Sequence, residues 1–119
     1  MDHERKEAAR SVDHRKINRL LGLAMKAGRV KSGAFLTEEA VRNGQASLVL
    51  LAADAEKNSR KAVTDKCSTY HVPVREYGTK QELGQAMGKG LRSCVAVTDA
   101  GFADAMQKLL DLQEKEMRE

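Results

Sequence analysis

Hydrophobic residues recur along this chain in two alternating patterns, one helical and one extended. Ile17, Leu20, Leu21 and Ala24 follow helical spacing, and Gly28 is a typical helix end. Similar stretches predict four more helices, while short apolar runs between turn residues predict strands. Helices are expected at residues 13–28, 34–43, 56–69 and 79–87 and from residue 99 onward, and strands at 29–32, 47–53, 72–77 and 93–98.

Two of the expected strands, residues 47–53 and 93–98, are continuous apolar runs. Such runs are typical of strands that are buried on both faces. Because helices alternate with strands throughout, the predicted fold class is α/β: a three-layer α/β/α sandwich around a small, mostly buried sheet of about four strands.

One segment in the second half of the chain predicts a strand, a loop and a capped helix in turn. Pro73 lacks a backbone N–H, so it marks the entry of the strand. Thr79 and Glu82 have the spacing of a capping box, with Lys80 at the junction of loop and helix. Gly84 has no side chain, so another backbone is expected to approach the helix there.

The length of 119 residues predicts one domain, which we place at residues 13–112. Residues 1–12 are charged and lack an apolar stripe. They are expected to form a flexible extension, disordered or helical only as a continuation of the first helix. Residues 113–119 are expected to form a charged tail in solvent.

The net charge is +4, and its excess lies on the predicted domain, where residues 17–110 carry 14 basic and nine acidic side chains. A basic domain favours a polyanionic partner, although the same charge can serve solubility. Aromatic residues are only 3% of the chain, which argues against a sheet that stacks bases on exposed rings. No apolar run reaches membrane-spanning length and the first residues do not resemble a secretory signal, so we expect a cytoplasmic protein without a membrane partner.

The residue types that carry catalysis are sparse and scattered. Cys67 and Cys94 each lie in an apolar stretch and are expected to be buried, reduced thiols. His71 is the one histidine outside the N-terminal region, and a solvated turn is its expected setting. Asp54, Asp65 and Asp99 are expected at a strand end, on a helix face and at a helix cap. We therefore expect no enzyme, no metal and no cofactor.

Four basic loops stand at the expected helix starts and strand ends. They are residues 28–33, residues 54–61, the helix start at Lys80, and residues 88–92. Helix N-termini and glycine-flanked amides bind phosphate, and a neighbouring lysine or arginine adds affinity. If these loops converge in space, they predict a nucleic-acid-binding face.

Five stretches, in order and at matching spacing, resemble one known family: residues 20–29 (LLGLAMKAGR), 50–55 (LLAADA), 65–67 (DKC) with 72–73 (VP), 78–84 (GTKQELG) and 95–102 (VAVTDAGF). The chain is identified by them as similar to the kink-turn-binding ribosomal (L7Ae/L30e-like) protein family, and most of all to its bacterial YlxQ-type branch. The resemblance covers about residues 14–110. It implies a mixed four-stranded sheet in an α/β/α sandwich and a non-catalytic RNA-binding protein.

Members of this family bind a kink-turn, a bulge that bends an RNA helix sharply and flips one base outward. The resemblance implies structured RNA as the partner, ribosomal or kink-turn-containing, together with the ribosome or translation-associated proteins. In relatives, the flipped base lies against a Glu, a Lys and an Arg, which match Glu56, Lys80 and Arg92. Leu91 matches an apolar contact of the same pocket.

The family's second helix carries G-x-N-E-x-x-K, whose last three named residues read sheared G·A pairs beside the bulge. Here the stretch is GAFLTEE: Gly33 is kept, while Phe35, Leu36 and Glu39 replace the Asn, Glu and Lys. Leu36 is interpreted as packing inward. Phe35 is expected to be exposed, either to stack on a base or to contact a protein, and the second use would make the fold a protein-interaction module. The predicted RNA-binding residues are thus Lys31, Gly33, Ala34, Phe35, Glu56, Lys80, Lys89, Leu91 and Arg92.

Overall fold

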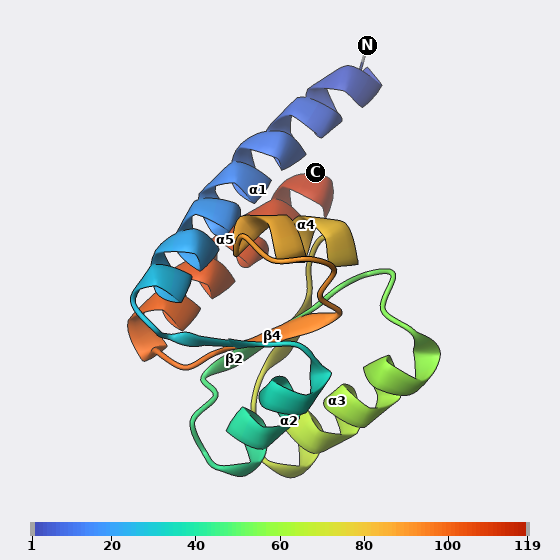
Figure 1. Ribbon diagram of the computed structural model, residues 1–119. Helices are drawn as coiled ribbons and strands as arrows, with labels where there is room; N and C mark the ends of the chain where they lie inside the picture. Colours follow the sequence, from blue (N-terminus) through green and yellow to red (C-terminus); the bar gives the residue numbers. More distant parts are fainter. Residues whose placement is uncertain (1, 119) are drawn as a thin grey trace.

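A computed structural model describes the backbone of residues 2–118 and the side chains of residues 14–116. Five helices alternate with four strands along this part of the chain (Figure 1). The elements are α1 (Asp2–Lys26), β1 (Val30–Ser32), α2 (Ala34–Arg42), β2 (Leu48–Leu51), α3 (Lys57–Thr69), β3 (Val74–Glu76), α4 (Lys80–Ala86), β4 (Cys94–Val97) and α5 (Ala100–Arg118). Each predicted helix and strand is confirmed, and each observed strand is shorter than the range predicted for it.

The four strands form one mixed sheet in the order β1-β4-β2-β3. β4 runs antiparallel to both β1 and β2, whereas β3 runs parallel to β2. Every residue of β2 and β4 is buried, as the continuous apolar runs predicted. The mixed four-stranded sheet implied by the family resemblance is therefore confirmed.

Helices cover both faces of the sheet, which gives the predicted three-layer sandwich (Figure 1). α1, α4 and α5 lie on one face, where Ile17, Leu21, Leu50, Leu83 and Met106 form the centre of the larger core. α2 and α3 lie on the other face over a smaller core that contains Val41, Val49 and Val63. Among the described residues, no helix is long and apolar enough to cross a membrane.

Both ends of the chain continue the helices of the domain. The backbone of α1 is helical from Asp2, so of the two states expected for the N-terminal extension the structure has the helical continuation. α5 continues to Arg118 through the residues expected to form a charged tail. Arg75 on β3 pairs with Asp111 at 2.8 Å and with Glu114 at 3.2 Å, and these ion pairs hold the extended helix against the sheet edge.

The capping box is confirmed in one of its two halves. The Thr79 hydroxyl accepts a hydrogen bond from the backbone N–H of Glu82, at 3.1 Å, and so caps α4. The Glu82 carboxylate lies instead 3.1 Å from Nδ1 of His14 on α1. The Tyr77 hydroxyl, which burial keeps protonated by raising its pKa, donates to Oδ1 of Asn18 at 2.6 Å. The first of these contacts with α1 fixes α4, and the second fixes the segment between β3 and α4.

Candidate nucleic-acid interface

Several loops meet at one end of the sheet, where β1, β2 and β3 end and β4 begins. Backbone hydrogen bonds join them: the N–H of Arg92 donates to the carbonyl of Lys80 at 3.1 Å, and the N–H of Gly33 donates to the carbonyl of Cys94 at 2.9 Å. Oδ1 of Asp54, the residue expected at a strand end, accepts from the N–H of Lys80 at 2.8 Å. The start of α4, the end of β1 and the loops after β2 and before β4 therefore form one continuous surface.

Lys80 and Glu56 face each other across this surface. Lys80 Nζ lies 3.6 Å from Glu56 Oε1, and the two side chains are 25% and 77% exposed. Because the two atoms are 3.6 Å apart and Glu56 is largely exposed, this ion pair contributes little to stability. Both groups therefore remain available to a ligand that offers each of them a better partner.

Arg92 lies over Gly33 at the start of α2. Its Nε donates to the hydroxyl of Ser32 at 3.3 Å, and its guanidinium also donates to the carbonyl of Leu91 at 2.9 Å. Gly33 has φ +91°, a conformation that L side chains rarely adopt, and a Cβ there would lie 3.9 Å from Cδ of Arg92. The glycine thus provides the turn into α2 and leaves bare backbone beside the arginine.

Arg60 on α3 supports the loop that carries Asp54 and Glu56, and the sequence analysis did not single it out. Its guanidinium donates to the carbonyls of Ala52 and Ala53, at 3.0 and 2.9 Å, and to the Glu76 carboxylate at 2.9 Å. The sequence offers one signal for this role: Arg60 lies in the first turn of the helix that follows the loop it supports.

Gly84 positions the loop that carries Leu91 and Arg92, as the predicted close approach requires. A Cβ on Gly84 would lie only 1.8 Å from the carbonyl oxygen of Gly90. Lys89 donates its backbone N–H to the Gly84 carbonyl at 2.8 Å. This loop therefore packs directly on the backbone of α4, with no room for a side chain between them.

Three large apolar side chains are exposed on the helix starts and loops at this end of the sheet. Phe35 is 74% exposed, Leu91 is 65% exposed and Leu36 is 41% exposed. The expected exposure of Phe35 is confirmed. The inward packing interpreted for Leu36 is only partial, since its neighbour Ala40 is buried while Leu36 keeps a large open area. Ala34, half-buried, packs on the smaller core.

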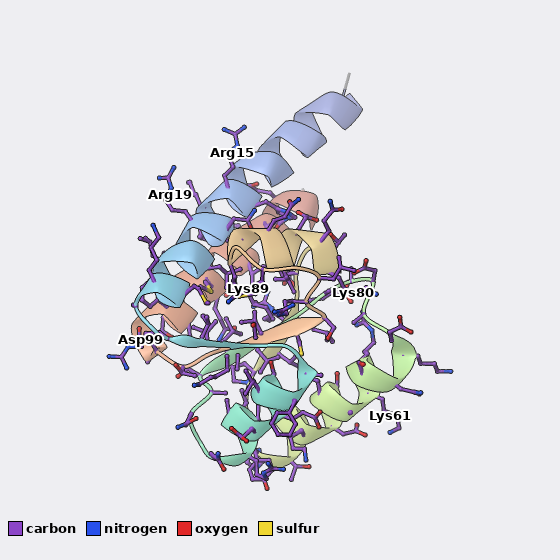
Figure 2. The ribbon with its side chains drawn as sticks, in the orientation of Figure 1. Arg15, Arg19, Lys61, Lys80, Lys89 and Asp99 are labelled. Carbon is purple, nitrogen blue, oxygen red and sulfur yellow. The ribbon has the colours of Figure 1, made fainter. Side chains whose placement is uncertain are left out.

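Two of the predicted site residues lie apart from this cluster. Lys31 is exposed on the edge strand β1 and lines an open hollow at the opposite end of the sheet, together with Arg29, Gln45 and Thr98. Lys89 is exposed just beyond the last turn of α4, and Figure 2 shows it at the other end of that helix from Lys80. Sequence spacing places both close to site residues, but the fold directs them elsewhere.

Titratable groups beneath the surface are held in their neutral forms. Cys67 and Cys94 are free and buried, and burial raises the pKa of the Cys67 thiol to about 11 and the pKa of Cys94 in the same direction.

His71 lies in an exposed turn, as expected. Asp99 caps α5 by accepting the N–H of Phe102 at 2.9 Å, as predicted. No cluster of three potential metal ligands occurs among the described residues.

Comparison with known proteins links this architecture to one family. The model described as "Ribosomal protein L7Ae/L30e/S12e/Gadd45 family" matches residues 15–107. The chain is 49% identical over 92 residues to RNA-binding protein YlxQ of Bacillus subtilis, covering 77% of this chain and 92% of that protein. It is 37% identical over 92 residues to large ribosomal subunit protein eL30 of Methanosarcina mazei, covering 76% and 85%.

Solved structures share the same fold. A protein of unknown function from Bacillus halodurans matches with a TM-score of 0.77 and 42% identity, over 81% of this chain and 97% of that one. The Giardia lamblia 15.5kD RNA binding protein matches with a TM-score of 0.68 over 89% and 88% of the two chains. Its identity is 22%, so this second likeness concerns the arrangement of helices and strands alone.

Proposed function

Because the chain belongs to the ribosomal protein L7Ae/L30e/S12e/Gadd45 family, we propose that it is a non-catalytic RNA-binding protein. We propose that structured RNA binds at the end of the sheet where β1, β2 and β3 end and β4 begins. Its relatives include proteins named for RNA binding and for the large ribosomal subunit. We propose a kink-turn as the RNA form and ribosomal RNA as its source. The contact surface comprises Gly33, Glu56, Lys80, Leu91 and Arg92.

One observation carries the proposal: residues from distant parts of the chain, two of them basic, converge at one end of the sheet. Lys80 and Arg92 are joined through their backbones by a 3.1 Å hydrogen bond, so their two basic side chains start from neighbouring positions. Gly33 adds exposed backbone beside Arg92. A lysine, an arginine and a bare backbone suit the phosphates and sugars of a folded RNA.

The proposed mechanism is selection of a bent RNA. Lys80 leaves its weak contact with Glu56 and binds phosphate, and Glu56 then accepts a hydrogen bond from the flipped base. Leu91 covers one face of that base, since its side chain is already open to solvent. Only the kinked conformation presents a flipped base and a narrow phosphate turn together, so binding draws the RNA ensemble toward it.

A reducing compartment fits the two buried thiols, which form no disulfide. We therefore propose that the protein acts in the cytoplasm with RNA and ribosome-associated partners, without membrane attachment. Lys31 lines a hollow at the other end of the sheet and is not part of the proposed contact surface.

The proposal is tested by titration of a kink-turn RNA and a plain duplex of equal length with the wild-type chain and with the Lys80→Ala/Arg92→Ala variant. We expect selective binding of the kink-turn and an affinity loss of about tenfold or more in the variant, because two charged contacts are lost. Arg42→Ala/Lys66→Ala, which removes the same charge from the α2–α3 layer, is the control. Unchanged kink-turn affinity in the folded Lys80/Arg92 variant would refute the site.

A second candidate function rests on the exposed Phe35. With Leu36 beside it, this side chain forms an apolar surface on α2 that suits a protein partner as well as a base. The Phe35→Glu variant separates the two. Loss of RNA affinity would assign Phe35 to the RNA interface, whereas unchanged RNA affinity with loss of a ribosome-associated protein partner would assign it to a protein interface.

A further inference from the structure

From His14 to Lys26, all charged side chains on the outward face of α1 are basic. Between His14 and Lys26 the helix contains no acidic residue, and its exposed side chains include Arg15, Arg19 and Lys26. Spacings of four and seven residues bring these three onto one line along the helix, opposite the buried Ile17. Figure 2 shows Arg15 and Arg19 directed away from the sandwich. We call these three residues the α1 basic stripe.

The cations of the stripe have no acidic partner within the described part of the molecule. Among the side chains of residues 14–116, the ion pairs of the basic residues Arg60, Lys61, Arg75 and Lys80 use acids of α3, β3, α5 and the loop before α3. None of these acids reaches the stripe. Like charges one helical turn apart, as in Arg15 and Arg19, oppose helix formation, so the stripe does not serve the stability of the fold.

The stripe lies beside the end of α4 from which the loop to the proposed RNA surface leaves. Gly22 lies on the flank of the stripe, and a Cβ there would be 3.4 Å from the carbonyl oxygen of Ala86, in the last turn of α4. Lys89 follows directly after that turn. In Figure 2 it lies between the two arginines of α1 and Lys80. Lys89 therefore adds a positive side chain near α1, at the start of the loop that also carries Arg92.

We propose that the α1 basic stripe, with Lys89, binds the phosphate backbone of an RNA stem that continues outward from the kink-turn surface. This inference rests on the proposed function and extends its contact area. A stem offers a regular row of phosphates, which a row of cations on a rigid helix matches without reading any base. A membrane surface suits the stripe less well, because the apolar face of α1 is already buried against the sheet and α5.

The experiment compares two kink-turn RNAs that differ only in stem length, one with stems of a full helical turn or more and one with stems cut to a few base pairs. Each is titrated at several salt concentrations with the wild type, the Arg15→Gln/Arg19→Gln variant and the control Arg42→Gln/Lys66→Gln. The control removes two cations from the opposite layer of the sandwich. Circular dichroism establishes that all three proteins have the same helix content.

For the long-stem RNA, we expect the Arg15/Arg19 variant to lose about three- to tenfold in affinity, with the slope of log K against log salt reduced by about one to two. Its affinity for the short-stem RNA should equal that of the wild type. Equal losses on both RNAs, or equal losses in the control, would overturn the inference, because either would indicate a general effect of net charge. Unchanged binding of the long-stem RNA would overturn it as well.

The outcome is separable from that of the proposed function. If the wild type binds the short-stem kink-turn through Lys80 and Arg92, the proposed function stands whatever the stripe variant does. If the wild type binds neither RNA, the proposed function fails and the role of the stripe fails with it.

Discussion

The starts of α2 and α4 lie at the same end of the sheet, yet they differ in the number of side-chain contacts that fix them. At the start of α4, Thr79 caps the helix, Asp54 accepts the N–H of Lys80, and Lys80 faces Glu56. The start of α2 has Gly33 as its N-cap with no side-chain hydrogen bond, and Phe35 projects into solvent.

The departures from the family pattern follow this difference. Lys80 and Arg92, which match the family, are tied into hydrogen bonds with neighbouring loops. Phe35 and Leu36, which the resemblance gives as departures from the family pattern, are exposed on α2, and Glu39, the third departure, is half-exposed. The comparison teaches that the start of α4 is fixed by contacts with other loops, whereas the start of α2 presents exposed side chains that few contacts constrain.

The largest expected effect comes from filling the space that holds the loop of Leu91 and Arg92. In Gly84→Ala, the new methyl group would meet the Gly90 carbonyl oxygen, so either the loop or α4 must move. We expect a loss of about 3 kcal/mol or more in unfolding free energy, measured by urea denaturation, with weakened RNA binding. Gly90→Ala is the matched control, because nothing lies within 4 Å of a Cβ at that position. Equal stability of the two variants would contradict the close packing.

The next effect restores the family pattern on α2. The variant Phe35→Asn/Leu36→Glu/Glu39→Lys should bind a kink-turn RNA with sheared G·A pairs about tenfold more tightly than the wild type, because it regains hydrogen bonds to base edges. Its unfolding free energy should change by less than about 0.5 kcal/mol per substitution, because the three positions are exposed or half-exposed. Weaker binding of that RNA would instead indicate that Phe35 itself contacts the RNA.

A smaller effect concerns the cap of α4. Thr79→Ala removes the acceptor of the Glu82 N–H and should cost about 1 kcal/mol of unfolding free energy. Thr79→Ser keeps a hydroxyl and should retain most of that stability, as a thermal or urea denaturation of both variants would establish. A loss of equal size in the serine variant would place the effect in packing of the threonine methyl group.

The smallest expected effect is that of Glu39→Lys alone. The change replaces a negative charge by a positive one beside the proposed phosphate path, which should raise RNA affinity about threefold at low salt and less at high salt. Stability should not change measurably. The single variant thereby separates the charge of α2 from its base-reading side chains, and a gain that persists at high salt would contradict an electrostatic origin.

The sequence predicts the fold because its local signals agree with one another. Apolar runs in β2 and β4, helical spacing in α1, and the residues at the helix ends all favour the same sandwich. The family resemblance read from five short stretches is confirmed by the family model, which matches residues 15–107. Local patterns could not predict contacts between residues that are distant in sequence. Glu82 turns to His14 across 68 positions of sequence, and Arg75 holds the last helix through Asp111 and Glu114.

The candidate site was predictable in its residue types more than in its geometry. Lys80, Arg92 and Gly33 come together as the convergence of basic loops required, whereas Lys31 and Lys89 lie apart from them. The direction of a strand residue such as Lys31 depends on register, which the sequence around it leaves open. The role of Arg60 was not predicted because two of its three partners are backbone carbonyls, which every residue carries, and the third, Glu76, is distant in sequence.

The central claim, selection of a bent RNA by the surface around Lys80 and Arg92, is tested most directly by energy transfer between dyes on the two stem ends of a kink-turn RNA. The titration is performed without divalent cations, so that the free RNA is extended. We expect transfer to rise as the wild-type chain binds, and to stay low with Lys80→Ala/Arg92→Ala at the same concentrations. Binding of the wild type without a rise in transfer would contradict the claim, because the RNA would then be held in its extended form.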